Sequence, residues 1–428
     1  MHCRRFGLPL CLLFALAPCA QAADKNSPAA GRIFQAGAFA ADITPLSLPI
    51  SVNGSMQPKQ ATEVHDRLHA RALVLDDGQL RIAIVVCDLC MIPRDVCDEA
   101  QGLVGRAAGI SADHMLISAT HTHSAAAVNA VFQAEPDPAY QHFVAVQIAK
   151  GIAQAAQNLE PARIAWGAGR NGDQVFNRRW ILKPGTVPPD PFGRKSDTVK
   201  MNPGAMNPNL VEPAGPVDPE VAVLSVQARD GRPIALLANY SLHYVGGVPP
   251  ISADYYGAFA ERIKELLDAT SAKPAFVGIM SNGTSGDVNN IDFRVPIERA
   301  AAGERIKVVA DSVARTAFDA TKKLRYRDWV PLAMRQREIE LGVRLPSQED
   351  VQAAEQILSA AQGPLKKVEE VYARETRLLA KYPPRVRAKL QAIRIGELGI
   401  ATTPCETFAE TGLAIKRESP LKPTFVIE

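Results

Sequence analysis

The chain has 428 residues, 47% of them hydrophobic and 22% charged, which is enough to bury a core in one large or two ordinary domains. The formal net charge is only +3, and no stretch combines clustered Lys and Arg with aromatic side chains. Nothing therefore indicates a nucleic-acid-binding protein.

The first 22 residues have the organisation of a secretory signal peptide. Residues 1–5 are basic, residues 6–18 form an apolar run too short to cross a bilayer, and Ala20-Gln21-Ala22 is a small-x-small cleavage site. Residues 16–19 also resemble a lipoprotein acylation box, but Pro18 directly before Cys19 fits it poorly. We therefore expect a secreted or periplasmic protein with a mature chain of residues 23–428, and no later run reaches transmembrane length.

The mature chain retains four cysteines, Cys87, Cys90, Cys97 and Cys405. Cys87 and Cys90 belong to an apolar run typical of a buried strand, where residues three apart face opposite sides. We interpret them as ordinary core cysteines rather than a redox or zinc pair. The fold is not expected to be a disulfide scaffold.

The first half of the mature chain alternates strands and helices. Asp76-Asp77-Gly78 is a strong hairpin signal between two of the strands, and Asp137 is a good N-cap for a helix with Pro138 at its first position. The expected strands are residues 33–43, 67–75, 79–89 and 114–117, and the expected helices are residues 93–108 and 138–158. On the second helix His142 lies on the polar face, so we expect it to be solvated.

Residues 168–219 are rich in Pro, Gly, Asn and Asp, and we expect no regular structure there. So long an irregular segment inside a compact domain is usually functional, as a lid or a wall of a binding site.

The second half continues the mixture without internal repeats. Ser347 and Asp350 form a capping signal for a helix that breaks at Gly363-Pro364 and then resumes. The expected strands are residues 221–228, 234–242, 274–280, 329–345 and 425–428, and residues 390–400 are expected to form a hairpin. The expected helices are residues 255–269, 300–323 and 347–382. The fold class is mixed α/β, and the apolar final run suggests a chain cut short.

Histidines stand where predicted strands end. His121 and His123 follow an apolar strand, and His243 follows another, in a chain with only eight histidines. Such positions match the rule that α/β sheets bind ligands at strand carboxyl ends. Catalytic zinc takes three His or carboxylate ligands and leaves one position for water. A pair of exposed loop histidines is the alternative, and the residues alone do not identify a carboxylate.

With these features the chain resembles the neutral/alkaline non-lysosomal ceramidase family over nearly its whole mature length. The matching segments are residues 37–45, 67–74, Ala119-Thr120-His121-Thr122-His123-Ser124, Asn177-Arg178, His243 with residues 252–257, Gly286-Asp287-Val288 and residues 404–408. The His-Thr-His-Ser and Gly-Asp-Val segments, in this order, are fairly specific together.

The resemblance implies a zinc amidase that separates a fatty acyl group from a sphingoid base. It places Zn²⁺ on His121, His243 and Glu406, with a fourth ligand, a tyrosine, expected beyond Glu428. It gives His123 contact with the substrate or the attacking water, and it makes Arg178 the group that stabilises the oxyanion. The family also has a C-terminal sandwich domain, which we do not expect within these 428 residues.

The chain departs from the family after Gly-Asp-Val, where Asn289 replaces a serine that takes part in catalysis. An asparagine cannot accept an acyl group, so the expected route uses a metal-activated water, and the Asn289 amide is left to bind the substrate. Asp287 and Asn282 are expected to shape a turn. Cys405 is expected to serve packing.

We therefore expect a zinc-dependent hydrolase acting on a small-molecule or lipid-like amide, with the oligomeric state left open. A binding protein that has lost the chemistry is one alternative. An amidohydrolase-type barrel is another, but it needs further strand-end histidines and an aspartate. Only His142 and His243 follow the pair, and His142 is placed on a helix.

Overall fold

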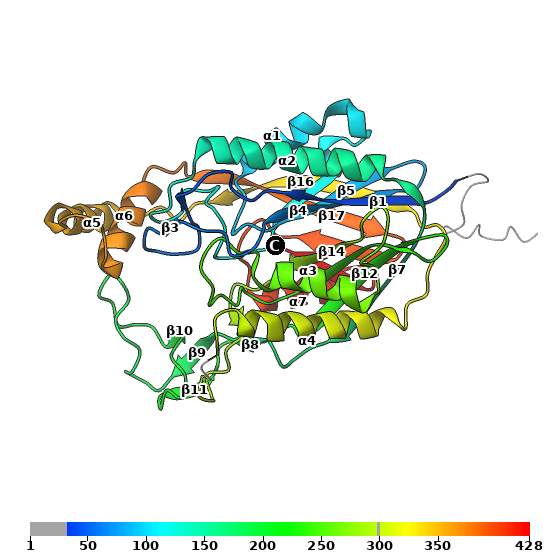
Figure 1. Ribbon diagram of the computed structural model, residues 1–428. Helices are drawn as coiled ribbons and strands as arrows, with labels where there is room; N and C mark the ends of the chain where they lie inside the picture. Colours follow the sequence, from blue (N-terminus) through cyan, green and yellow to red (C-terminus); the bar gives the residue numbers. More distant parts are fainter. Residues whose placement is uncertain (1–31, 298–299) are drawn as a thin grey trace, which may run out of the picture.

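The computed structural model describes residues 32–297 and 300–428 and shows a mixed α/β fold, as expected (Figure 1). The signal peptide predicted for residues 1–22 lies outside the described residues. No helix in the described part of the chain is long and apolar enough to span a membrane.

An eight-stranded sheet forms the centre, with strand order β14-β13-β12-β7-β1-β4-β5-β6. Neighbours are antiparallel except β13 with β14 and β5 with β6, which are parallel. The strands are β1 Gln35–Asp42, β4 His69–Asp76, β5 Arg81–Cys87, β6 Met115–Ala119, β7 Glu160–Arg170, β12 Glu220–Ala228, β13 Pro233–Tyr240 and β14 Val277–Asn282. The edge strand β14 contacts β5 and β6, at the far end of the strand order, without pairing with them. These contacts show that the sheet curls.

This sheet is not a parallel barrel. It mixes directions and leaves β14 and β6 as edges, so the amidohydrolase-type alternative does not apply. The predicted hairpin between β4 and β5 is present, and its Gly78 has a φ of +83°, a conformation open to glycine at little cost.

A second, four-stranded sheet packs against the first. Its strands are β16 Leu332–Gly342, β17 Arg385–Ile395, β18 Leu398–Thr402 and β19 Thr424–Ile427. Leu73, Leu224 and Ile279 of the large sheet share one buried cluster with Ile393 and Phe425 of the small one. Because the facing sides of the two sheets are buried against each other, the strands of both sheets are rich in apolar residues.

Helices cover the outer face in two pairs (Figure 1). Helices α1 Arg94–Val104 and α2 Pro138–Gln157 pack over β1 and β4, and α3 Asp254–Leu266 and α4 Glu304–Thr321 pack over β7, β12 and β14. Asp137 caps α2 as predicted, with its carboxylate 2.8 Å from the Ala139 nitrogen. Two 3₁₀ turns, Gly105–Ala108 and Ala112–His114, separate α1 from β6.

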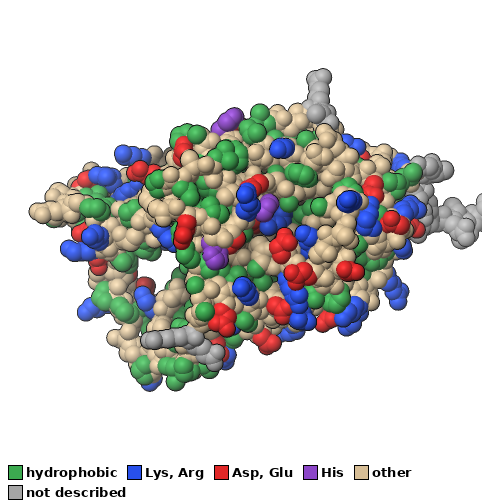
Figure 2. All heavy atoms as spheres, in the orientation of Figure 1, with side chains coloured by type: hydrophobic (Ala, Val, Ile, Leu, Met, Phe, Trp, Pro, Cys, Tyr) green, Lys and Arg blue, Asp and Glu red, His purple; other side chains and the backbone are tan. Residues whose placement is uncertain are grey.

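The remaining elements are short or peripheral. Helices α5 Gln348–Ala360 and α6 Val368–Leu379 form a projecting pair (left in Figure 1), and α5 begins with the predicted capping box of Ser347 and Asp350. Helix α7 Ala409–Glu418 precedes β19, and a two-stranded ribbon joins β2 Ile50–Ser51 to β3 Gln60–Ala61. Charged side chains of both signs are interspersed over the visible face, in keeping with the small net charge (Figure 2).

The prediction that residues 168–219 lack regular structure is wrong. Besides the end of β7, this segment contains β8 Phe176–Asn177, β9 Arg179–Leu182, β10 Val199–Met201 and β11 Leu210–Pro213, and β10-β9-β11 form a sheet. Two to four residues per strand are too few to reveal a period of two among prolines and glycines. A cavity of about 570 Å³ lies between residues 191–194 and helices α5 and α6.

Candidate metal centre

Three segments remote in sequence deliver the candidate ligands to one place. His121 and His123 follow β6, His243 follows β13, and Glu406 lies between β18 and α7. β6 is at one edge of the large sheet and β13 is next to the other, so the curl of the sheet brings their ends together. The three imidazole rings have centroids 4.7 to 5.1 Å apart.

Backbone carbonyl groups fix the tautomers of two of the rings. Nδ1 of His121 lies 2.8 Å from the Cys90 carbonyl oxygen, and Nδ1 of His123 lies 2.9 Å from that of Gly54. Because a carbonyl oxygen only accepts, both Nδ1 atoms carry the proton and both Nε2 atoms present a lone pair. These two Nε2 atoms lie 3.1 Å apart, and neither carries a proton to donate to the other.

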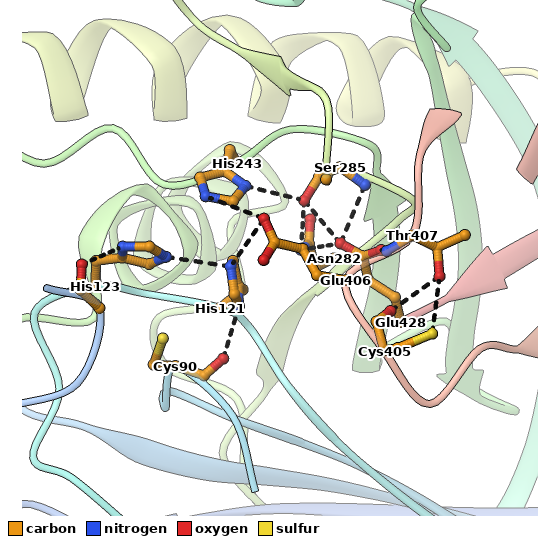
Figure 3. A network of polar contacts seen from close by, with 12 residues as sticks. Cys90, His121, His123, His243, Asn282, Ser285, Cys405, Glu406, Thr407 and Glu428 are labelled. Atoms are coloured by element: carbon orange, nitrogen blue, oxygen red, sulfur yellow. Dashed lines mark hydrogen bonds and ion pairs between the residues drawn. The ribbon is translucent and has the colours of Figure 1, made fainter. Parts of the chain in front are cut away.

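His243 presents the same kind of group to the same space. Its side chain is 1% exposed, and its Nε2 atom is buried without a hydrogen-bond partner. An unpartnered buried nitrogen is costly unless something binds it. Nε2 of His243 and Nε2 of His121 lie 4.0 and 3.9 Å from Oε1 of Glu406 (Figure 3).

These distances fit a divalent metal ion. Tetrahedral ligand atoms that lie 2.0–2.2 Å from one zinc ion are about 3.3–3.6 Å apart, slightly closer than the 3.9 and 4.0 Å contacts of Glu406 with the two histidines. His121, His243 and Glu406 are residues of zinc's common ligand set and lie close to the spacing that the ion needs. Their ligand atoms all lie within 4.8 Å of one another. The two backbone-bonded imidazoles have the outer partners that oriented metal ligands require.

The histidines are neutral at neutral pH, which is the form that binds metals. Burial lowers the pKa of His121, although the nearby Glu406 carboxylate opposes the effect. Burial and the neighbouring His121 lower the pKa of His123 to about 3. Burial, His121 and Arg178 hold the pKa of His243 well below its ordinary value.

Arg178 orients the carboxylate of the set. Its Nη2 atom donates to Oε1 of Glu406 at 2.8 Å, and its Nε and Nη2 atoms donate to the Gly286 carbonyl oxygen at 3.2 and 2.7 Å. The Arg178 side chain is 12% exposed and that of Glu406 is 46% exposed. The arginine is therefore not an ordinary surface residue, and the open side of the centre lies at Glu406.

The loops that carry the histidines are held by buried polar groups. His121 has a φ of +71°, a left-handed conformation that is uncommon for non-glycine residues and recurs at functional sites. The hydroxyl of buried Thr122 donates to the Ser252 carbonyl oxygen at 3.0 Å. Asp254, at the start of α3, accepts from the backbone of Val245 at 2.9 Å and of Gly246 at 2.7 Å, directly after His243. Burial raises the Asp254 pKa.

Asn289 lies on β15 Val288–Asn289, which pairs with β8 beside Arg178. Its side-chain nitrogen donates to Asn202 at 3.2 Å and its oxygen accepts from the Ile291 backbone at 3.0 Å. These hydrogen bonds run to Asn202, directly after β10, and to Ile291 two residues along the chain, and not to the three imidazoles. The Asp287 carboxylate accepts from the Ala409 backbone at 2.8 Å and from the Asn177 side chain at 3.0 Å, so it joins remote segments rather than shaping its own turn.

Four residues that support the site were not identified from the sequence. Glu428 is partly buried and accepts at Oε1 from Asn282, from the Ser285 backbone and from the Ser285 hydroxyl, at 3.0, 3.0 and 2.8 Å (Figure 3). The same hydroxyl lies 3.4 Å from Nδ1 of His243, so Glu428 and Ser285 orient that ring. The sequence feature that could have pointed to Glu428 is an acidic residue directly after an apolar strand. Tyr244 stacks on His123 with ring centroids 3.9 Å apart. No pattern in the sequence pointed to Gly54 as part of the site.

One cysteine interpretation needs correction. Cys90 is a buried core residue, as predicted, and its sulfur also lies within 4.8 Å of one ring nitrogen each of His121 and His123. Cys405 does not serve packing, since it is exposed, and its sulfur lies 3.6 Å from the Thr407 hydroxyl. Its position on the open side next to Glu406 explains the exposure. His142, as expected, is largely exposed.

Fold and site together define a mixed α/β protein with a buried histidine–carboxylate centre suited to a metal ion. The sequence profile described as neutral/alkaline non-lysosomal ceramidase, N-terminal, matches residues 34–293. The chain therefore belongs to the neutral/alkaline non-lysosomal ceramidase family.

Solved structures agree on the fold. The neutral ceramidase from Pseudomonas aeruginosa is 18% identical with a TM-score of 0.66, over 90% of this chain and 64% of that one. A ceramidase complexed with C2 gives the same identity and TM-score, over 90% of this chain and 65% of that one. This chain thus spans just under two thirds of the length of those proteins.

Proposed function

We propose that this protein is a zinc-dependent hydrolase that cleaves the N-acyl amide bond of a lipid-like substrate. The observation that carries the proposal is the convergence of two tautomer-fixed Nε2 atoms, the unpartnered Nε2 of His243 and Oε1 of Glu406. Neutral imidazoles and a carboxylate are ligands that zinc prefers.

His121, His243 and Glu406 are the proposed ligands. When bound there, zinc would lower the pKa of a water molecule to about 7 and polarise the scissile carbonyl group. Arg178 would hold Glu406 in position and offer positive charge to the amide oxygen as negative charge develops on it. His123, held by Gly54 and Tyr244, presents Nε2 as an acceptor for the attacking water or for a substrate hydroxyl.

Water is the proposed nucleophile because Asn289 stands where the family has a serine. The Asn289 amide would contribute a hydrogen bond to the substrate from the wall formed by β8 and β15. Family membership makes ceramide the first substrate to test, since the similar structures are of ceramidases. The predicted signal peptide adds the proposal that the protein acts in the periplasm or outside the cell.

The test is a panel of N-acyl amides and esters, ceramide included, assayed before and after removal of metal with a chelator. We expect one zinc ion per chain, and activity that disappears with the chelator and returns with zinc. His121→Ala should lose both zinc and activity. His142→Ala is the matched control, because His142 is exposed on α2 and pairs with Glu99 away from the centre. Zinc-free protein with undiminished activity, or His121→Ala equal to the control, contradicts the proposal.

A binding protein without catalysis is the second candidate, favoured by the engagement of the Asn289 side chain with Asn202 and Ile291. It predicts saturable binding of an acyl amide to the zinc-loaded protein with no product formed. Product release from any amide of the panel excludes it.

A further inference from the structure

Cys90 and His123 extend the centre on the side away from Glu406. The sulfur of Cys90, one ring nitrogen of His121 and one ring nitrogen of His123 all lie within 4.8 Å of one another, as do the ligand atoms of His121, His243 and Glu406. In Figure 3 Cys90 lies below the two imidazoles, and Glu406 lies on the opposite side of His121. His121 is the member that the two sets share.

The shared residue makes the sets exclusive. Nδ1 of His121 is committed to the Cys90 carbonyl oxygen at 2.8 Å, so only Nε2 is free to bind an ion. The Nε2 atom of His123 is 3.1 Å from it, with its own Nδ1 committed to Gly54. One lone pair serves one metal ion, so an ion held by Cys90 and His123 takes His121 from the other set.

The two sets differ in chemical softness. The first offers two nitrogens and a carboxylate oxygen, whereas the second offers two nitrogens and a sulfur. Thiolate ligands select soft, thiophilic ions over those that prefer oxygen. Cys90 is 2% exposed, which shields the bound sulfur from water and from other thiols.

We propose that Cys90, His121 and His123 form a second cation site for thiophilic ions such as Cd²⁺, and that its occupation excludes a metal ion from the set of His121, His243 and Glu406. When Cd²⁺ binds, the S–H bond of Cys90 breaks, a sulfur–cadmium bond forms, and the proton passes to the buffer. If the enzyme uses the set of His121, His243 and Glu406, Cd²⁺ bound to the second set inhibits it, and this consequence rests on the proposed function. The binding of Cd²⁺ to Cys90, His121 and His123 does not depend on the proposed function.

The experiment titrates the metal-free full chain with Cd²⁺ and follows the ultraviolet charge-transfer absorption of a cadmium–thiolate bond. We expect the band to saturate at one Cd²⁺ per chain with release of a proton, and prior loading with zinc to weaken Cd²⁺ binding as zinc is added. Cys90→Ser should lose the absorption band. Its Cd²⁺ affinity should fall by at least about 10–100-fold, because losing even a residue that only supports a metal ligand costs that much.

Cys405→Ser is the matched control, because Cys405 is the exposed thiol beside Glu406 and the competing source of such a band. The band should persist in that variant. His123→Asn removes a nitrogen of the second set alone, so it should weaken Cd²⁺ binding while the chain still binds one zinc ion. This variant keeps the test open if Cys90→Ser does not fold, as judged by circular dichroism. A band that survives Cys90→Ser, that is lost in Cys405→Ser, or that zinc leaves unchanged overturns the proposal.

Discussion

Gly54 packs directly against the imidazole of His123. A Cβ atom added to Gly54 would lie 2.4 Å from Cγ of His123, and the φ of Gly54 is +95°. Its carbonyl oxygen also fixes the tautomer of the ring, at 2.9 Å from Nδ1. The loop between β2 and β3 therefore determines where Nε2 of His123 points, and only glycine can approach so closely.

Gly54→Ala should displace the His123 ring, and a misplacement of about 1 Å can cost about 10²-fold in rate. We expect kcat/KM to fall by that order while zinc content stays at one per chain, because His123 is not among the proposed ligands. Gly172→Ala is the control, since a Cβ there meets no atom within 4 Å. Equal kcat/KM in the two variants would show that the position of His123 does not matter.

Arg178→Lys should weaken zinc binding by about 10–100-fold, the usual cost of losing a residue that orients a metal ligand. A lysine reaches either Glu406 or Gly286 but cannot reproduce the forked contact with both. The neighbouring Arg179→Lys is the control, because the Arg179 guanidinium lies over the Phe408 ring. Zinc affinity is measured by competition with a chelating dye. If Arg178→Lys lowers kcat alone, its role is confined to the oxyanion.

Asp254→Asn should loosen the loop after His243. The carboxylate accepts backbone hydrogen bonds from Val245, Gly246 and Tyr255, and an amide cannot accept all three. An unsatisfied buried group costs about 1–3 kcal/mol, so we expect a loss of that order in the free energy of unfolding, together with weaker zinc binding. Asp319→Asn, at an exposed ion pair with Lys322 on α4, should change neither quantity. Chemical denaturation and zinc titration of both variants decide the matter.

Glu428→Gln should remove a pH dependence of stability. Burial, only partly offset by donated hydrogen bonds, raises the pKa of Glu428 from 4.5 to about 8. Between these values the folded protein binds a proton that the unfolded chain releases, so stability falls as the pH rises through this window. One proton contributes about 1.4 kcal/mol per pH unit. Unfolding of the metal-free protein, measured from pH 5 to 8, should show a smaller slope in the variant. An unchanged slope contradicts the assignment.

Local signals in the sequence were enough for most elements. The hairpin at Gly78, the cap at Asp137 and the capping box at Ser347 were predicted correctly, because turn and cap chemistry depends on a few adjacent residues. The strand ends before His121 and His243 were equally visible. Glu406 and Arg178 became candidates only through the family resemblance, since no local pattern distinguishes them from other charged residues.

Only the tertiary structure decided which side chains meet. The curl of the large sheet joins the end of β6 to the end of β13, and the packing of the second sheet carries Glu406 and Glu428 to the same place. Gly54, Cys90 and Tyr244 enter the site through contacts between segments far apart in the chain. By itself the sequence determined the strands, their caps and the residue types available for chemistry, because these depend on neighbours in the chain. The composition of the centre depends on how the layers pack, which no local pattern encodes.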